Sequence, residues 1–348
     1  MKKKDIRTLS LEELQAFFVE MGAQKFRAKQ VYEWLWKKGA YTFEEMTNLS
    51  KTLREQLKEV FVILPITEDL SQHSNDGTIK TRFRLHDGHL IESVLIPVPQ
   101  QNRYTVCISS QVGCSLSCKF CATGQMDRLR NLTAGEIYDQ VVKVNAQCQA
   151  HFQHDLTNIV YMGMGEPLLA YKSVLRSIEL LTSPQGLHMS PKRLTISTAG
   201  IAKMIKRLAD DGTRVNLALS LHAADDEKRN SIMAINESNN LATLVEALGY
   251  FYTKTKDSKI TFEYIAFDGF NDSLEDAKNL LQLCRQVPTA KVNVIEYNPV
   301  SGVDFVKSQG DQLEQFAQYL RKNGVAITLR RSRGKDIDAA CGQLANKE

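Results

Sequence analysis

The order of apolar and polar positions divides the chain into three stretches with different periods. Between residues 10 and 60, apolar residues recur near helical spacing, which predicts a small module of three or four short helices. From Ile66 to Pro97 the runs are short and alternating, and Asp76-Gly77 and Asp87-Gly88 are typical of tight turns between strands. We therefore predict a helical module at 1–62, a β-rich linker at 63–100 and a larger domain at 101–348.

Beyond Tyr104, apolar strand-like runs alternate with helical patterns. This rhythm predicts a parallel sheet whose strands are joined by crossover helices. Six or seven such units predict an α/β fold, a partial (β/α)6-type barrel similar to a TIM barrel, in which ligands bind at the carboxyl ends of the strands. We expect the strands at 105–110, 158–164, 193–199, 215–222, 260–267, 291–298 and 326–332.

Composition narrows the class of protein. With 43% hydrophobic and 24% charged residues, the chain is expected to be a soluble globular protein. No stretch approaches the ~20 apolar residues that would span a bilayer, and no apolar run follows the basic start, so we expect a cytoplasmic protein without a membrane segment. The formal net charge of +4 is too modest to indicate a nucleic-acid partner by itself.

Seven cysteines include three within eight residues, Cys114, Cys118 and Cys121. The odd number and this crowding argue against a disulfide framework and favour metal binding or catalysis. Their spacing allows each thiolate to bind one iron of a [4Fe–4S] cluster, which leaves the fourth iron open for a substrate. The alternative is a zinc site, but that would need a fourth ligand, and Cys148 and Cys284 fall in predicted helices.

Polar residues also recur where barrel strands should end. The turn Gly163–Pro167 follows an apolar strand, and Glu166 within it could bind an ammonium group or a ribose hydroxyl. Taken singly, such residues are more often structural, so only their common placement suggests a ligand site. The others are Ser197, Ser220, His222 and Asn298.

Two further cysteines lie in polar surroundings outside the cluster spacing. Cys341 follows four cations within the stretch 330–335, and such a field favours the nucleophilic thiolate. Cys107 precedes the cluster segment by seven residues. For either cysteine alone, a structural role remains equally open.

Together these segments resemble the RlmN/Cfr family of radical S-adenosylmethionine methyltransferases. The resemblance covers nearly the whole chain, and Phe120 stands immediately before the third cysteine of the cluster, as it does in that superfamily. The RlmN branch is closer, because MGMGEPLL retains Pro167. The motifs that carry the resemblance, in chain order, are SSQVGC, CATG, MGMGEPLL, STAG, LSLHA, YNP and DIDAACGQL.

The resemblance implies a radical SAM barrel that uses two molecules of S-adenosylmethionine per turnover. Cys341 would take a methyl group from the first molecule. The second, cleaved at a [4Fe–4S] cluster on Cys114, Cys118 and Cys121, would yield a radical that activates this methyl group for addition to adenine. Cys107 would release the product by forming a disulfide with Cys341, and Glu92 would accept the ring proton. The implied cofactor pocket consists of Gly165, Glu166, Ser197, Ser220, Leu221, His222 and Asn298.

The resemblance also implies an RNA substrate. Family members methylate an adenosine in the peptidyl-transferase region of 23S rRNA, and some also methylate the adenosine 3′ of a tRNA anticodon. We expect carbon 2 as the target, with the carbon-8 product of the Cfr type as the alternative, on a base that is flipped or presented from a loop. The basic helical module, 128–130 and 330–335 are candidate RNA contacts, although the helical module could equally be a solvated face.

A flavodoxin or ferredoxin would supply electrons, and we expect a monomer. A hypothesis from another class is a non-catalytic RNA-binding protein with a structural zinc ion.

Overall fold

The main element of the computed structural model, which describes residues 3–287 and 290–346, is a ten-stranded sheet with the order β14-β13-β12-β11-β10-β9-β6-β5-β4-β3. Seven of these strands, from β14 to β6 in the sheet order, are parallel to one another. The sheet is open, because its end strands are β14 and β3. The predicted α/β partial barrel is thus confirmed. The parallel strands are β6 (Arg103–Cys107), β9 (Asn158–Tyr161), β10 (Leu194–Thr198), β11 (Asn216–Ser220), β12 (Ile260–Ala266), β13 (Lys291–Glu296) and β14 (Ala326–Arg330).

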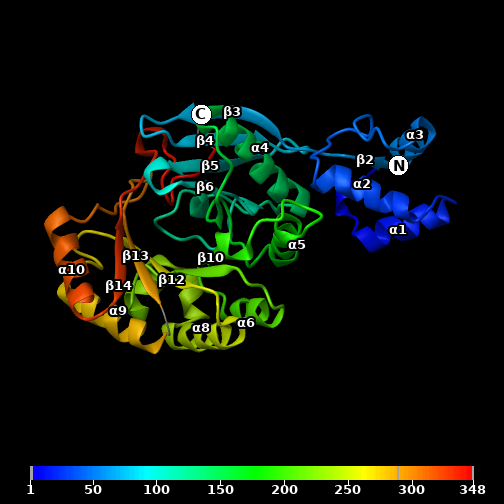
Figure 1. The fold of residues 1–348 in the computed structure, drawn as a ribbon. Coiled ribbons are helices and arrows are strands. Elements are labelled where there is room, and N and C mark those ends of the chain that lie inside the picture. Colours follow the sequence, from blue (N-terminus) through cyan, green and yellow to red (C-terminus); the bar gives the residue numbers. More distant parts are fainter. Residues whose placement is uncertain (1–2, 288–289, 347–348) are drawn as a thin grey trace.

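Crossover helices connect these strands and cover the outside of the sheet (Figure 1). The first of them begins at a capping box, in which the Thr133 side chain accepts from the backbone N–H of Glu136 and the Glu136 side chain accepts from that of Thr133. A short helix, α7 (Asp226–Ile232), precedes the fourth crossover helix. The crossover helices are α4 (Ala134–Phe152), α5 (Tyr171–Thr182), α6 (Ala202–Asp210), α8 (Leu241–Thr255), α9 (Leu274–Gln286) and α10 (Gly310–Lys322).

The segment predicted as a β-rich linker forms the antiparallel strands β3 (Thr67–His73), β4 (Ile79–Arg84) and β5 (Leu90–Val98). These strands extend the main sheet, because β5 pairs with β6 through Val94 and Cys107. Most residues of β5 are buried. The strands were correctly predicted, but burial makes them part of the main body rather than a bridge.

The N-terminal module contains α1 (Leu11–Glu20), α2 (Phe26–Trp36) and α3 (Lys51–Val60), and it lies to one side of the sheet beyond α4 and α5 (Figure 1). Residues 42–50, which the helical pattern included, form turns instead. The helix begins only after Ser50, whose side chain accepts from the backbone N–H of Leu53.

The module is joined to the sheet by buried polar contacts. The Arg7 guanidinium forms an ion pair with Asp139 of α4 at 2.8 Å. The Tyr138 hydroxyl donates to the backbone carbonyl of Trp36. Because both contacts are buried, the module and the sheet share one hydrophobic core.

No helix in the described ranges is long and apolar enough to cross a membrane.

Short elements complete the chain. The short strands are β1 (Lys4–Asp5), β2 (Phe61–Val62), β7 (Gln111–Val112) and β8 (Arg130–Asn131), and the 3-10 helices span Ile6–Thr8, Pro99–Gln101, Thr123–Gln125, Pro191–Arg193, Ala234–Glu237 and Lys335–Ile337.

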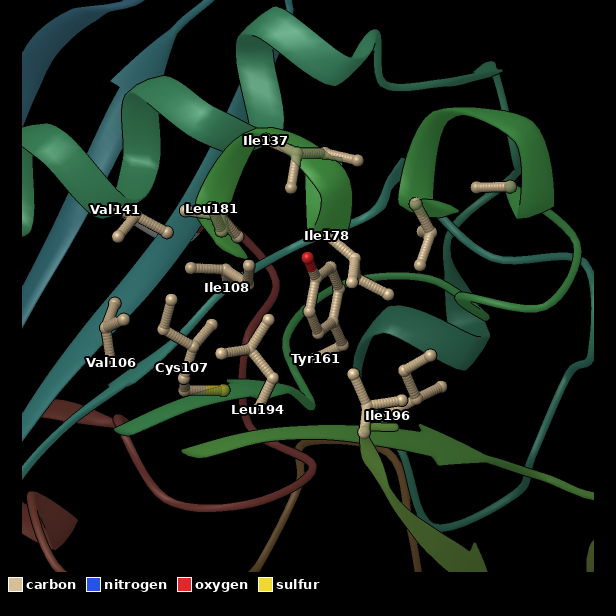
Figure 2. Close-up of a cluster of buried hydrophobic side chains, with 14 of the residues drawn as sticks. Val106, Cys107, Ile108, Ile137, Val141, Tyr161, Ile178, Leu181, Leu194 and Ile196 are labelled. Carbon is tan, nitrogen blue, oxygen red and sulfur yellow. The ribbon is translucent and has the colours of Figure 1, made fainter. Parts of the chain in front are cut away.

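The alternation of side chains along β6 places Cys107 on the face of the sheet away from α4. Figure 2 shows Val106 and Ile108 on the side of Ile137 and Val141, whereas the sulfur of Cys107 lies on the other side. The face of β6 toward α4 therefore packs in the apolar core, and the opposite face carries the Cys107 thiol.

Candidate functional site

A cavity opens at the carboxyl ends of the parallel strands. It encloses about 880 Å³, part of it open to solvent. Its walls come from the loop after β6, the ends of β9 to β13, and the C-terminal segment 331–346. Of the residues predicted from sequence, it is lined by Cys114, Cys118, Cys121, Gly165, Glu166, Ser197, Ser220, His222 and Cys341. Leu221, Asn298, Cys107 and Glu92 lie outside its lining.

The three clustered cysteines lie on a loop that folds tightly on itself. A Cβ atom at Gly113, whose φ is +72°, would lie 2.0 Å from the carbonyl oxygen of Asp127, and one at Gly124 would lie 2.7 Å from that of Cys118. The backbone N–H of Cys121 donates to the Cys118 carbonyl at 3.2 Å. Glycine is therefore required at Gly113, both for backbone conformation and for space.

The clustered thiols interact with one another. Burial raises the pKa of Cys114 to about 11 and also raises the pKa of Cys118 and Cys121. The charges of Cys114 and Cys121 raise the pKa of Cys118 further. Without a metal, ionising such buried thiols is unfavourable. Iron binding stabilises the thiolates and so compensates for their burial.

The donor set fits an iron–sulfur cluster. Three cysteine sulfurs open on one cavity, and each could bind a different iron. Across residues 3–287 and 290–346, no three His, Cys, Asp or Glu side chains converge on the position of a single metal ion.

The turn after β9 holds Glu166 in a buried and fully bonded position. Its Oε1 accepts from the backbone N–H of Leu168 at 3.0 Å, and its Oε2 from that of Ala199 at 2.8 Å. Burial raises the pKa of Glu166 to about 7. Gly165 has φ +93°, and a Cβ atom there would lie 2.4 Å from the Cβ of Gln111. The carboxyl group thus ties the ends of β9 and β10 together.

The ends of β10 and β11 present two hydroxyls and an imidazole. The hydroxyls of Ser197 and Ser220 are 3.3 Å apart. His222 Nδ1 accepts from the backbone N–H of Ile265 at 3.1 Å, and its ring lies edge-on to Phe120 with centroids 4.6 Å apart. Burial lowers the pKa of His222 to about 3, so the imidazole is neutral near pH 7. The cluster loop, through Phe120, therefore packs directly on the predicted cofactor pocket.

Two predicted pocket residues are engaged elsewhere. The carbonyl of Leu221 accepts from Arg229 Nε at 3.1 Å. Asn298 Nδ2 donates to Ser332 Oγ at 2.9 Å and to the carbonyl of Glu296 at 3.2 Å. Both are close to the strand ends, but in this arrangement they support the pocket instead of lining it.

Cys341 is brought to the cavity by the C-terminal segment. The carbonyl of Gly342 accepts from the backbone N–H of Ala122 at 2.7 Å, and that of Leu344 from Thr123 Oγ1 at 2.6 Å. The segment is therefore hydrogen-bonded to the cluster loop itself. The sulfur borders the cavity, so its surface is exposed there while protein surrounds it on the other sides.

The expectation that four cations would favour the Cys341 thiolate is wrong. Burial raises the pKa of Cys341, and of the four cations only Arg330 is a main influence that lowers it. Lys335 forms an ion pair with Glu296 at 2.5 Å, and Arg333 donates to the carbonyl of Asp76 at 3.3 Å. The cations follow each other in sequence, but their side chains serve different partners.

The charge of Cys341 acts on Cys107. Burial raises the pKa of Cys107, and the charge of Cys341 is the second cause. The seven cysteines are free thiols in this structure.

Glu92 holds the C-terminal segment. It is buried on β5, and its Oε2 accepts from the backbone N–H groups of Ala345 at 3.0 Å and Asn346 at 3.2 Å. Lys80 Nζ lies 3.7 Å from the other carboxylate oxygen. The carboxylate therefore faces the segment that carries Cys341, not the cavity.

Sequence reasoning missed three residues that organise the site. Arg229 is fully buried beneath it, while Asp76 and Asp336 bind the C-terminal segment to the β3–β4 turn. A charged residue on a short helix or in a turn gives no sequence signal of such a role, because burial and long-range partners define it.

Comparisons with known proteins agree with this geometry. Residues 4–63 match the family described as Ribosomal RNA large subunit methyltransferase N-terminal domain, and residues 108–283 match the Radical SAM superfamily. Proteins from Cytophaga hutchinsonii and Flavobacterium johnsoniae, each named probable dual-specificity RNA methyltransferase RlmN, are 58% and 52% identical to this chain. Both alignments cover 100% of this chain, with 94% and 99% of the two relatives.

A solved structure, that of a radical SAM methyltransferase from Sphaerobacter thermophilus, is 39% identical to this chain with a TM-score of 0.91. The match covers 99% of this chain and 100% of the other.

Proposed function

The chain belongs to the RlmN family of radical S-adenosylmethionine RNA methyltransferases, and on that premise we propose that it methylates carbon 2 of adenosine in 23S rRNA and in tRNA. The observation that carries the proposal is the meeting of Cys341 with the three clustered cysteines around one cavity. The names of the relatives, which describe dual-specificity RNA methyltransferases, support two kinds of RNA substrate.

Cys114, Cys118 and Cys121 would hold a [4Fe–4S] cluster, which when bound supplies the electron that splits S-adenosylmethionine and generates a radical. The Ser197 and Ser220 hydroxyls form a polar edge for the hydroxyl or carboxylate groups of this cofactor. Gly165 allows its backbone to approach closely.

Cys341 acts as the methyl carrier in this proposal. Its sulfur forms a bond to the methyl carbon of one S-adenosylmethionine as the bond from that carbon to the sulfonium breaks. The thiol must lose its proton first, and Arg330 is the protein cation that favours this. The positive sulfonium of the incoming cofactor acts in the same direction.

The detour through a cysteine has a chemical reason. Carbon 2 of adenine is electron-poor and has no lone pair, so it does not attack a sulfonium, whereas a carbon radical can add to it. The adduct is then tied to Cys341 and carries one unpaired electron, which would pass to the oxidised cluster as the ring proton leaves. The Cys107 thiolate then bonds to the Cys341 sulfur while the carbon–sulfur bond breaks, and the electron pair of that bond stays on the carbon, which takes up a proton and becomes the methyl group. The influence of the Cys341 charge on the pKa of Cys107 supports this pairing.

Glu92 would accept the ring proton, as the family resemblance implies. Its carboxylate already accepts hydrogen bonds from the backbone N–H groups of Ala345 and Asn346. These hydrogen bonds must break before the carboxylate can reach the adenine ring. Proton removal is thereby linked to movement of the C-terminal segment.

The N-terminal module would contact the RNA. Arg27 lies over the ring of the exposed Phe26 at 4.8 Å, and Lys38 lies over the ring of Trp34 at 3.7 Å. Cations beside aromatic rings suit a phosphate backbone with unstacked bases. We further propose a monomer that receives electrons from a flavodoxin or ferredoxin.

The proposal is tested by anaerobic reconstitution followed by iron and sulfide analysis and by methylation of 23S rRNA fragments and tRNA. Cys118→Ala is expected to lose the cluster and methylation together, whereas Cys341→Ala keeps the cluster and loses methylation only. Cys284→Ala, which removes a partly buried thiol from α9, is the matched control and should change neither.

Mass spectrometry of digested RNA then locates the methyl group. A methyl group on carbon 8 would contradict the carbon-2 assignment and identify a reaction of the Cfr type. Zinc without iron in the wild-type protein, or methylation that survives Cys118→Ala, would refute the radical mechanism.

A further inference from the structure

Arg229 of α7 is 0% exposed and lies directly beneath the site. Its Nη2 donates to the carbonyls of Ala199 at 2.5 Å and Ser220 at 3.2 Å, two residues that line the cavity. Its Nε donates to Leu221 and its Nη1 to the side-chain oxygen of Asn236. The guanidinium thus joins the ends of β10 and β11.

All of these acceptors are neutral. The carboxylate of Asp226, on the same helix, accepts instead from Asn236 Nδ2 at 2.8 Å and from the backbone N–H of Leu241 at 2.9 Å. A buried cation whose hydrogen bonds go to neutral groups carries a large desolvation cost. Burial lowers the pKa of Arg229 to about 10, which still leaves it charged near pH 7.

Arg229 and the cluster loop are connected through α7. Cys118 and Asp226 are the two groups whose charges act on Arg229 in the opposite sense to burial. The backbone N–H of Lys119, next to Cys118, donates to the carbonyl of Ile232 at the end of α7 at 3.0 Å. The helix that carries Arg229 is therefore attached to the loop that carries the cysteines.

We propose that Arg229 is a positioning residue that provides the counter-charge for the iron–sulfur cluster and so favours its one-electron reduction. The inference rests on the cluster of the proposed function. Three thiolates around a cluster bring negative charge into a buried site, and reduction adds one more. A fixed cation buried beneath the site stabilises the reduced state more than the oxidised state, because Coulomb attraction grows with the charge.

The test is a redox titration of the reconstituted full-length enzyme, followed by electron paramagnetic resonance. Arg229→Gln removes the charge and keeps a polar side chain. We expect the equilibrium constant for reduction to fall about tenfold, which for a one-electron couple corresponds to about 59 mV. Arg229→Lys keeps the charge and should stay near the wild-type potential.

Lys228→Gln is the matched control, since Lys228 is adjacent on α7 but pairs with Asp276 at 2.6 Å. It should leave the potential unchanged. An unchanged potential in iron-loaded Arg229→Gln would overturn the inference. A fall of equal size in Arg229→Lys would also overturn it, because the planar hydrogen-bonding fork would then matter rather than the charge.

If Arg229→Gln does not fold, Arg229→Met, which also removes the charge, is measured by the same criterion. The wild-type protein separates this inference from the proposal on which it rests. If the reconstituted wild type holds no iron, the proposed function fails. If it holds the cluster and the variants behave alike, only the role of Arg229 fails.

Discussion

The cluster loop and the C-terminal segment meet in one cavity but are held there by different forces. In the loop, the backbone packs against itself so closely that Gly113 and Gly124 leave no room for a side chain. The C-terminal segment depends on hydrogen bonds between carboxylates and distant parts of the chain. Asp336 accepts from Ser74 Oγ at 2.5 Å, and Asp76 accepts from the backbone N–H of Gly334 at 3.1 Å.

This difference separates a rigid part of the site, the cluster loop, from a movable part, the C-terminal segment. Close backbone packing holds a single shape, as a bound cluster requires. Polar contacts near the surface can break and re-form without disturbing the core. We expect this of the segment with Cys341, because a methyl carrier must meet both a cofactor and an RNA base.

The largest effect is expected from breaking the loop. Gly113→Ala places a Cβ atom against the carbonyl of Asp127 at a φ of +72°, so we expect a loss of about 3 kcal/mol or more in unfolding free energy. Iron binding should be lost as well. Chemical denaturation and iron analysis measure the two effects.

Gly88→Ala is the control for this change. Gly88 has a similar φ of +84°, and a Cβ atom added there would meet nothing within 4 Å, so only about 1 kcal/mol of backbone strain is expected. Equal losses in the two variants would show that close packing does not define the loop.

The next effect concerns pH and the pocket on which the loop packs. The pKa of Glu166 is raised to about 7, so its contribution to stability is complete below its ordinary value and is lost as pH rises through 7. The pKa of His222 is lowered to about 3, so its contribution is complete above about pH 6.5 and is lost as pH falls. Between pH 7 and 5 the two effects oppose each other.

Removing either group should therefore leave the pH dependence of stability that the other group causes. On going from pH 7 to 5, Glu166→Gln is expected to lose about 2 kcal/mol relative to the wild type, and His222→Asn to gain about 2 kcal/mol. Urea unfolding of the cluster-free protein at both pH values measures this. Variants that follow the wild-type curve would show that these pKa shifts are absent.

The smallest change in stability is expected from the C-terminal segment. Asp336→Ala removes an exposed anchor, so the unfolding midpoint and the iron content should stay near the wild type. Methylation of Cys341, followed by mass spectrometry of the intact protein, should slow about tenfold because the thiol is less well positioned.

Asp336→Asn keeps one acceptor for Ser74 and should restore part of the rate. Asp304→Ala, which removes an exposed carboxylate after β13, is the control and should leave the rate unchanged. Loss of iron in Asp336→Ala would contradict the separation of the two regions.

Much of the fold was predictable because buried parallel strands are continuous apolar runs. The seven predicted strands all appear in the sheet, in chain order. Within the predicted helical module, residues 42–50 have helical spacing but form turns before the Ser50 cap. Periodicity predicted the strands of the linker but not that they join the main sheet, because it carries no information on strand pairing.

The sequence by itself determined the family, the partial barrel and the thiols available for chemistry, because local spacing and motif order carry that information. Only the tertiary structure decided how those groups are tuned and held. Long-range contacts direct Glu92 to the C-terminal segment, burial raises the pKa of Cys341 against expectation, and Arg229 lies buried at the ends of β10 and β11. Burial and electrostatic fields depend on neighbours far away in the chain, and no local pattern encodes them.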